Sequence, residues 1–235
     1  GSGTGLTAPL AMRFPQTQFL GLETDERTLR HASSLYKDLS NLSFSNHLPE
    51  DLRFDLVIAS EVIEHVEDGP AVLRYLHSHL ESGGKLLITL PNGYGPFEWI
   101  SLLESAARWM KRNIFRSYIR RHPACSDTLA ISPHLHFYSF RNILYMLRIS
   151  GFRVDAYRGR SFLCGLAISP IIDSSKHLVR WNSFAADVLA PKFCSSWMFL
   201  CSKGALPAVS PAPKLENSVY TRWKRRLNVA NAERG

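Results

Sequence analysis

The stretch Gly1-Ser2-Gly3-Thr4-Gly5 decides the fold, because glycines at alternating positions let a polar ligand approach the backbone amides closely. Nucleotide-binding α/β folds place an acidic residue about 20 positions further on, where it grips a ribose. Glu23 stands at that distance and closes the apolar run Phe19-Leu20-Gly21-Leu22, a predicted strand. Glycine loop, helix, strand and terminal acid in this order predict half of a nucleotide-binding unit.

Strands and helices alternate in the pattern that follows. The predicted strands are 19–23, 42–45, 54–60 and 85–90, and the predicted helices are 6–14, 25–37 and 70–80. The segment 54–60 is almost continuously apolar, which is typical of a strand buried on both faces. The alternation predicts an α/β fold with a Rossmann-like, mostly parallel sheet covered by helices on both faces.

The pattern loosens after residue 90. It predicts an amphipathic helix over 97–121, a helix over 140–150 between Ser139 and Gly151, a strand over 152–155, a helix over 174–189 and a strand over 197–200. We expect one domain over 1–204, with a helical lid insertion at 94–135 after the strand 85–90 and a second insertion at 160–194. We expect the Pro-rich linker and basic tail at 205–235 to be disordered.

Composition indicates a soluble globular protein. The 235 residues are 45% hydrophobic and 20% charged, and no apolar run approaches the roughly 18 residues of a membrane-spanning helix. The four cysteines form no CxxC pair, which favours thiols in a reducing, cytoplasmic compartment. The presence of a signal peptide stays an open alternative, because the natural N-terminus is predicted to be absent.

The net charge of +8 is unevenly distributed. The basic residues gather in two blocks: Arg108, Lys111, Arg112, Arg116, Arg120 and Arg121, and then Lys214, Arg222, Lys224, Arg225 and Arg226. Such concentration suits an anionic partner, either a phosphorylated substrate, a membrane surface or a nucleic acid. A solvated helix face with a disordered tail is an equal alternative.

Four segments in order resemble the class I S-adenosylmethionine-dependent methyltransferases of the small-molecule type, which include the ubiquinone-pathway O-methyltransferases. They are Gly1–Gly5, Gly21–Asp25, Phe54–Val66 and Leu80–Pro91, and the histidine–aromatic segment His134–Gly151 is similar as well. The resemblance covers about residues 1–155. It implies that the chain begins at the glycine motif without the first strand of the sheet, so we expect this polypeptide alone to fold poorly and to bind its cofactor weakly.

The resemblance implies S-adenosyl-L-methionine as the cofactor and supplies a set of binding residues. Glu23 would accept both ribose hydroxyls, while Ser45 and Asn46 stand where many relatives carry an Asp near adenine. Parallel strands bind ligands beyond their carboxyl ends, so one sheet edge is expected to gather the whole set. The expected cofactor-binding residues are Gly1, Ser2, Gly3, Thr4, Gly5, Glu23, Thr24, Ser45, Asn46, Ser60 and Glu61.

A dehydrogenase with an NAD(P)-binding Rossmann domain is the rival interpretation. Its fingerprint requires a glycine or alanine three positions after the second glycine, where this chain has Leu6. The segment Glu61-Val62-Ile63-Glu64-His65 also has no role in that scheme, which disfavours the dehydrogenase. A degenerate, non-catalytic cofactor-binding or regulatory protein stays open as a different class.

Catalysis by such an enzyme requires alignment of the acceptor and, for an oxygen acceptor, removal of a proton. His136 and His134 are the candidate bases, followed by His65. The alternative for a histidine beside Phe137 is that it only ties a loop to a backbone carbonyl. Glu64 and His65 are adjacent on a helix and point apart, so we predict no metal site.

The acceptor is expected to be a small or lipid-like molecule methylated at oxygen. The aromatic residues Phe97, Trp99 and Trp109 fall where the lid would cover it, although core packing is the commoner role for any one of them. The basic helix 98–121 is a candidate for peripheral membrane contact, with plain solvent exposure as the alternative. No nucleic-acid partner is predicted, since no Pro-Pro-Tyr-type base-flipping motif is present.

Overall fold

The computed structural model of the chain describes residues 2, 5–96, 136–164 and 168–207. The chain divides into two compact units, Gly1–Leu52 and Arg53–Gly235, which are described separately. The predicted amphipathic helix over 97–121 and the basic tail lie outside the described residues, and so does nearly all of the predicted lid.

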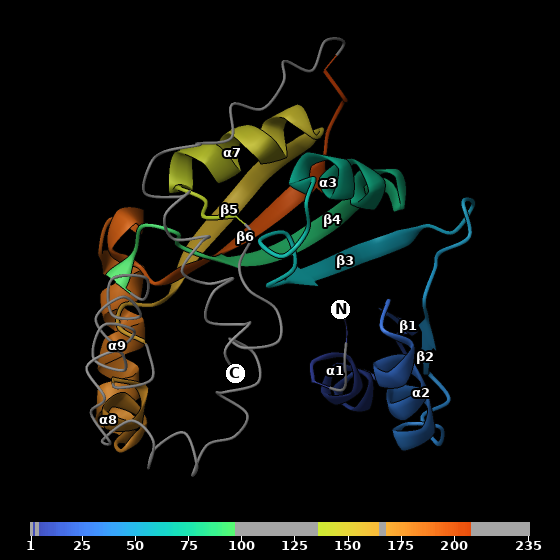
Figure 1. The fold of residues 1–235 in the computed structure, drawn as a ribbon, viewed down its shortest axis with the longest axis horizontal. Helices are drawn as coiled ribbons and strands as arrows, with labels where there is room; N and C mark the ends of the chain where they lie inside the picture. The colour runs from blue at the N-terminus through green and yellow to red at the C-terminus, as the bar shows by residue number, and fades with distance from the viewer. Residues whose placement is uncertain (1, 3–4, 97–135, 165–167, 208–235) are drawn as a thin grey trace, which may run out of the picture. The chain divides into compact units, whose positions relative to one another are not determined.

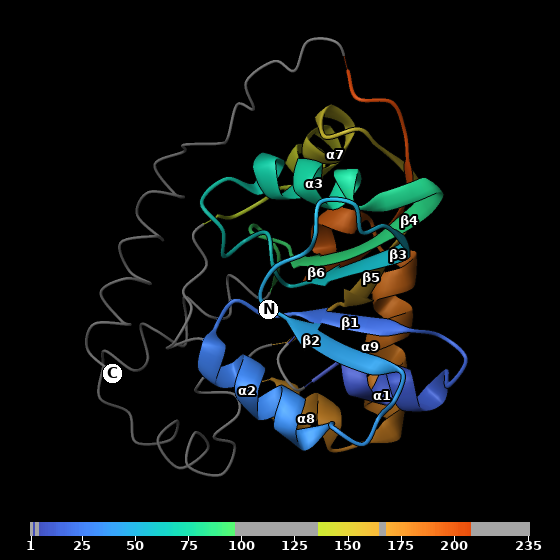
Figure 2. The same cartoon turned by 90° about the vertical axis from the view of Figure 1, so that its right-hand side faces the viewer.

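The smaller unit contains two helices and two parallel strands (Figure 2). Its elements are α1 (Thr7–Arg13), β1 (Phe19–Leu22), α2 (Glu26–Leu35) and β2 (Leu42–Ser45), with Phe19 opposite Leu42 and Leu22 opposite Ser45. Asp25 caps α2 as predicted, because its carboxylate accepts a hydrogen bond from the Thr28 amide at 2.8 Å. This bond stabilises the ionised carboxylate and lowers the pKa of Asp25.

A buried asparagine joins the end of α1 to the start of β2. The Asn41 side-chain amide donates to the carbonyl oxygens of Ala11 at 3.0 Å, Phe14 at 3.3 Å and Thr17 at 3.0 Å. Carbonyl groups that a turn leaves unpaired need such a donor when water is excluded. The loop that carries the chain from α1 into β1 is therefore closed by one side chain, which sequence patterns did not single out.

The larger unit is built on a four-stranded sheet (Figure 1). Its elements are β3 (Phe54–Ser60), α3 (Gly69–Ser78), β4 (Leu80–Pro91), α7 (Phe140–Ile149), β5 (Phe152–Ser161), α8 (Ser169–Asp173), α9 (Lys176–Val188), the 3-10 helix η1 (Pro191–Phe193) and β6 (Ser196–Lys203). The strand order is β3-β4-β6-β5, with β3 parallel to β4 and β6 antiparallel to both of its neighbours. The α/β class and the mostly parallel direction are confirmed, since only β6 runs against the others.

Two helices cover the sheet together, and a third packs at its side. Figures 1 and 2 both show α3 and α7 next to each other over the sheet, whereas α9 lies against β5. Leu86, Ile88 and Leu90 of β4 are fully buried in the core. They pack with Leu73 of α3, Ile143 and Leu147 of α7, and Trp197 and Phe199 of β6. Ser139 caps α7, and Gly151 ends it at φ 86°, both as predicted.

Three predicted boundaries differ from the structure. Strand β4 begins at Leu80 instead of residue 85, because Leu80 pairs with Phe54 before the chain turns through Gly83 at φ 85°. Strand β5 reaches Ser161 and β6 spans Ser196–Lys203, because each is lengthened by pairing with the other. Short apolar runs could not reveal this pairing between strands that lie far apart in the sequence.

The prediction that 54–60 is buried on both faces is wrong for its first half. Asp55 and Leu56 are exposed, and Leu56 keeps 49% of its surface in contact with solvent. The physical reason is that β3 lies at the edge of the four-stranded sheet and pairs there only with β4. The expectation of a missing first strand stays a prediction.

Strand β5 deviates from its ladder with β6 at two points. The register shifts between Val154 and Ala156, and again between Gly159 and Ser161, so Asp155 and Arg160 are the two extra residues. Such a bulge redirects a side chain. The Asp155 carboxylate accepts from Lys85 Nζ on β4 at 2.7 Å and from the Ser202 hydroxyl on β6, which ties three strands together. These bonds, that of Lys85 first, lower the pKa of Asp155 to about 2.

This pKa predicts how stability depends on pH. A carboxyl group whose pKa is depressed on folding stabilises the protein above its usual pKa of 3.8, and the contribution is lost as the pH falls through about 2. Replacing Asp155 with Asn should lower the midpoint of urea unfolding at pH 7, and the difference from the unaltered protein should shrink between pH 4 and pH 2. The exposed Asp173→Asn is the control. A difference that stays constant over this range would contradict the assignment.

Candidate functional site

The predicted glycine loop is joined to the end of β1. The Ser2 amide donates to the Leu22 carbonyl at 2.9 Å, whereas Gly1, Gly3 and Thr4 lie outside the described residues. A Cβ atom on Gly21 would lie 2.5 Å from the Phe44 ring and 2.8 Å from the Ser2 hydroxyl, so only glycine permits this approach. The Ser2 hydroxyl is buried and has no hydrogen-bond partner among the described residues, while a Cβ atom on Gly5 would meet open space. The described part of the loop therefore contains a polar atom that pairs with no other described residue.

Glu23 lies one residue beyond β1, and its position is set from two sides. Its amide donates to the Ser45 carbonyl at 2.9 Å, which continues the parallel ladder, and its Oε1 accepts from the Asp25 amide at 3.1 Å. Only 7% of Glu23 is exposed, whereas Thr24 next to it faces solvent. A carboxylate held in this way after a parallel strand has the position and the acceptor atoms that a ribose diol requires.

The side chains of Ser45 and Asn46 make hydrogen bonds to His47 within a local turn. The Ser45 hydroxyl donates to the His47 carbonyl at 2.6 Å and accepts from the His47 amide at 3.2 Å. The side-chain oxygen of Asn46, Oδ1, lies 2.8 Å from His47 Nδ1. Sequence reasoning did not consider His47, whose ring and backbone both orient these two predicted adenine-side residues.

Ser60 and Glu61 belong to the larger unit and form a hydrogen-bonded chain with Thr89 and Arg160. Glu61 Oε1 accepts from the Thr89 hydroxyl at 2.9 Å and from Arg160 Nη1 at 2.9 Å. Because the Thr89 hydroxyl has a single proton, the Ser60 hydroxyl must donate to Thr89 Oγ1, at 2.9 Å. Thr89 and Arg160 were missed from the sequence, since their sole signal is their position near the carboxyl ends of β4 and β5.

Glu61 also has an unusual backbone. Its φ of 54° is the one positive value at a non-glycine residue in the described part of the chain. A residue held in this left-handed region costs of order 1–3 kcal/mol and persists when its surroundings impose it. The ion pair with Arg160 is 46% and 39% exposed, and a solvent-exposed pair contributes only about 0–1 kcal/mol. Stability alone does not account for this arrangement.

His136 is a buried histidine that is tied to the loop after β3. Its amide donates to the Glu64 carbonyl at 3.1 Å, and its ring Nε2 lies 3.0 Å from the Glu67 carbonyl oxygen. A carbonyl oxygen can only accept, so Nε2 carries the proton and Nδ1 is the basic ring atom. His65 Nε2 lies 3.8 Å from Glu64 Oε1, and Glu64 is fully buried. His134 lies outside the described residues.

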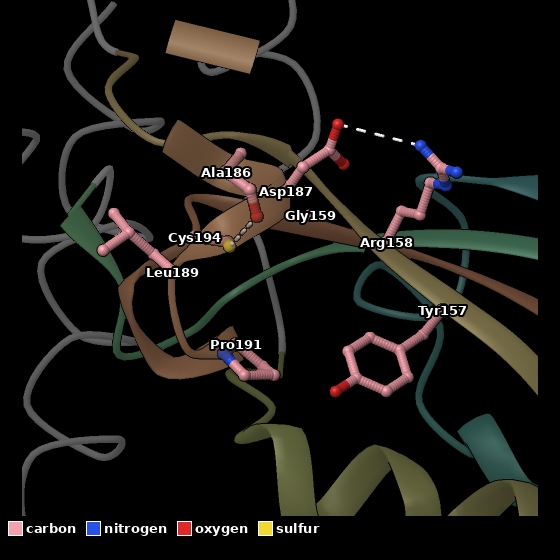
Figure 3. A pocket seen from close by; sticks show the side chains of 8 residues that line it. All are labelled: Tyr157, Arg158, Gly159, Ala186, Asp187, Leu189, Pro191 and Cys194. Carbon is pink, nitrogen blue, oxygen red and sulfur yellow. Dashed lines mark hydrogen bonds and ion pairs between the residues drawn. The ribbon is translucent and has the colours of Figure 1, made fainter. Parts of the chain in front are cut away.

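A separate pocket of about 340 Å³ opens between β5 and the segment from α9 to η1 (Figure 3). Arg158 and Asp187 face each other there at 3.7 Å, and the Cys194 thiol donates to the Ala186 carbonyl at 3.2 Å. A Cβ on Gly159 would lie 2.5 Å from both the Ala186 oxygen and the Cys194 sulfur, so glycine is required for α9 to approach β5. The pocket contains none of the predicted site residues.

The described residues show neither a metal cluster nor a reactive thiol. Within them, no group of three His, Cys, Asp or Glu side chains is arranged to hold a metal ion. Burial raises the pKa of Cys164, and it raises that of Cys201 to about 12, so both are neutral thiols at physiological pH. The helices in this part of the chain are too short or too polar to cross a membrane.

Comparison with known proteins identifies the family. Residues 1–157 match the family model described as a methyltransferase domain. The chain belongs to this family. A trans-aconitate 2-methyltransferase from Deinococcus radiodurans is 37% identical over 94 residues, which are 39% of this chain and 36% of that protein. The match thus spans little more than a third of the curated relative.

Solved methyltransferase structures share the fold at low sequence identity. An S-adenosylmethionine-dependent methyltransferase from Mesorhizobium loti has a TM-score of 0.52 and 18% identity, covering 86% of this chain and 88% of that one. Mycolic acid cyclopropane synthase CmaA1, solved with S-adenosylhomocysteine, has a TM-score of 0.54 and 17% identity, covering 86% and 76%. The predicted fold and the predicted cofactor, S-adenosyl-L-methionine, are confirmed.

The residues of the smaller unit fit this cofactor. Glu23 has a fixed carboxylate just beyond β1, where a ribose-binding acid is expected. Among the described residues, the buried Ser2 hydroxyl has no hydrogen-bond partner. The loop precedes α1, a helix of seven residues whose N-terminus has no side-chain cap. Glu23 is accordingly the residue whose replacement tests the site most directly.

We expect Glu23→Gln to weaken the affinity for S-adenosylhomocysteine about 10- to 150-fold, measured by calorimetric titration. Gln keeps the shape and can still accept from the Asp25 amide, but it is neutral. A hydrogen bond to a charged group contributes about 1.5–3 kcal/mol, against about 0.5–1.5 kcal/mol for a neutral one, and two ribose hydroxyls would lose this difference. The matched control is Glu26→Gln, because Glu26 is 70% exposed on α2 and pairs with Arg30. Equal affinities for the two variants would remove Glu23 from the cofactor site.

Proposed function

We propose that this protein transfers a methyl group from S-adenosyl-L-methionine to an oxygen atom of a small acceptor molecule. The observation that carries the proposal is the buried carboxylate of Glu23, which accepts from the Asp25 amide just beyond β1, in a chain of the methyltransferase family. The curated relative is named for trans-aconitate, a small acid with oxygen nucleophiles, which supports an oxygen acceptor of similar size.

The cofactor supplies a methyl group that is already activated on a sulfonium. The protein therefore has to bind and align the reactants and exclude water from them. Alignment alone can substantially lower the activation free energy of methyl transfer. Glu23 is proposed to hold the ribose, while Gly1–Gly5 and Thr24 contribute to the same cofactor site. Ser60 and Glu61, in the larger unit, also remain proposed cofactor-binding residues.

An acceptor hydroxyl must also lose its proton, and we propose His136 as the base. Its Nε2–H is held by the Glu67 carbonyl and its ring stacks on Tyr138 at 5.7 Å, so the basic Nδ1 has a defined direction. Proton transfer by a well-placed histidine base can contribute about 10²–10⁴-fold. His134 and His65 are the alternative bases. An acceptor carboxylate needs no base, because it is already ionised at neutral pH.

A wider form of the proposal includes a lipid-like acceptor and peripheral membrane contact through the basic helix 98–121. That form rests on the sequence alone, because these residues lie outside the described part of the chain. The similarity to a methyltransferase named for trans-aconitate, a small acid, favours the narrower proposal, in which the acceptor is a small molecule. A non-catalytic, cofactor-binding protein is the alternative that the following experiment separates.

The test begins with calorimetric titration of the full-length protein with S-adenosylhomocysteine, followed by turnover assays on small hydroxyl and carboxyl acceptors. We expect the protein to bind S-adenosylhomocysteine in the titration. We also expect it to form S-adenosylhomocysteine from S-adenosyl-L-methionine during turnover on at least one oxygen acceptor. Absence of binding would contradict the methyltransferase proposal. Binding without turnover on any acceptor would support the regulatory alternative.

For His136, the informative variant is His136→Gln, which can still donate to the Glu67 carbonyl but cannot act as a base at neutral pH. On a hydroxyl acceptor, kcat should fall about 100-fold or more, while the affinity for S-adenosylhomocysteine changes little. Turnover on a carboxylate acceptor should be much less affected. Parallel losses of kcat and cofactor affinity would show that His136 is a structural residue.

A further inference from the structure

The Arg160 side chain is directed by a bulge and by a carboxylate. Arg160 is the extra residue between Gly159, which is opposite Trp197, and Ser161, which is opposite Ser196. Its Nη1 donates to Glu61 Oε1 at 2.9 Å and lies 3.5 Å from Thr89 Oγ1. The guanidinium on β5 is thereby brought to residues at the ends of β3 and β4.

Both residues of this ion pair are positioned by an irregular backbone conformation. Arg160 requires the register shift of β5, and Glu61 requires a left-handed conformation at φ 54°. Bulges and strained residues are over-represented beside functional sites, where they aim a side chain at a ligand. The pair itself is too exposed to repay this cost as a stabilising contact.

The guanidinium retains hydrogen-bonding capacity. It has five N–H donors in a planar fork, and all of its interactions with the described part of the chain are made through Nη1. Its Nε and Nη2 donors face no protein partner there, and 46% of the side chain is exposed. A planar carboxylate with two oxygens matches such a fork better than a neutral hydroxyl does.

The location suits a ligand as well. Strands β3 and β4 are parallel, and β5 runs in the same direction because both β4 and β5 are antiparallel to β6. The carboxyl ends of these strands carry Glu61, Thr89 and Arg160 to one edge of the four-stranded sheet. Open α/β sheets bind their ligands beyond this edge.

We infer that Arg160, oriented by Glu61 and Thr89, binds a carboxylate of the methyl acceptor, so that the acceptor is a small organic acid. This inference rests on the proposed methyl transfer and narrows its substrate class. Arg160 is a binding residue that sets specificity. It keeps an acidic group of the acceptor in place while another oxygen receives the methyl group.

The experiment measures binding of three acids to the full-length protein by calorimetry, with and without saturating S-adenosylhomocysteine. The probes are benzoate, fumarate and trans-aconitate, and the neutral trimethyl ester of trans-aconitate is the uncharged comparison. We expect at least one acid to bind, the ester to bind at least 10-fold more weakly, and Arg160→Gln to weaken the acid at least 10-fold. Arg160→Lys, which keeps the charge but loses the fork, should be intermediate.

The matched control is Arg158→Gln, two positions earlier on β5, where the side chain is 72% exposed and pairs with Asp187 (Figure 3). Arg158→Gln should leave acid affinity unchanged, and S-adenosylhomocysteine affinity should stay within twofold in the Arg158 and Arg160 variants. Equal acid affinity in Arg158→Gln and Arg160→Gln, or no binding of any acid, would overturn the inference. Loss of S-adenosylhomocysteine binding in Arg160→Gln alone would place Arg160 in the cofactor site instead.

The experiment distinguishes failure of the proposed methyl transfer from failure of the proposed acid binding by Arg160. If the unaltered protein binds no S-adenosylhomocysteine, the proposed methyl transfer is wrong, while the acid titrations without the cofactor product still report on Arg160. If the cofactor product binds and an acceptor is turned over with an unchanged KM in Arg160→Gln, the methyl transfer stands and the acid-binding role is wrong.

Discussion

Pairing of β4 on both of its edges is the constraint on which the larger unit depends. Its residues from Lys85 to Thr89 pair in parallel with β3 and antiparallel with β6, while Leu86, Ile88 and Leu90 are removed completely from water. A strand in this position cannot shift by one residue without turning its apolar side chains to the opposite face. Its register consequently sets the position of every polar group that it carries.

Two of those polar groups connect β4 to the bulges of β5 across the intervening β6. Lys85 at one end contacts Asp155, and Thr89 at the other end contacts Glu61 beside Arg160. The first link is a structural tie that neutralises charges between three strands. The second lies at the carboxyl edge, where a ligand binds in folds of this class. The same strand pairing thus positions a stabilising ion pair at one end and the proposed acid-binding arginine at the other.

Some residues of the candidate site could be predicted from the sequence, and others could not. Glu23 follows from sequence, because an acid that ends a parallel strand at the expected distance from a glycine loop is typical of a ribose-binding residue. Ser60 and Glu61 follow from the same reasoning applied to β3. Arg160 could not be found in this way, since it lies nearly 100 residues from Glu61 and comes from a strand whose length was underestimated. The partners of His136 were equally hidden, because backbone carbonyls carry no sequence signal.

The sequence by itself determined the α/β class, the order of most strands and helices, the caps at Asp25 and Ser139, and the position of the acid Glu23 at the end of a strand. These depend on local periodicity, on capping chemistry and on spacing along the chain, which are all readable residue by residue. Only the tertiary structure decided the edge position of β3, the extent of β4, β5 and β6, and the meeting of Arg160 with Glu61. The physical reason is that strand pairing and bulges arise between segments distant in sequence, where hydrogen bonds across the sheet override local preference.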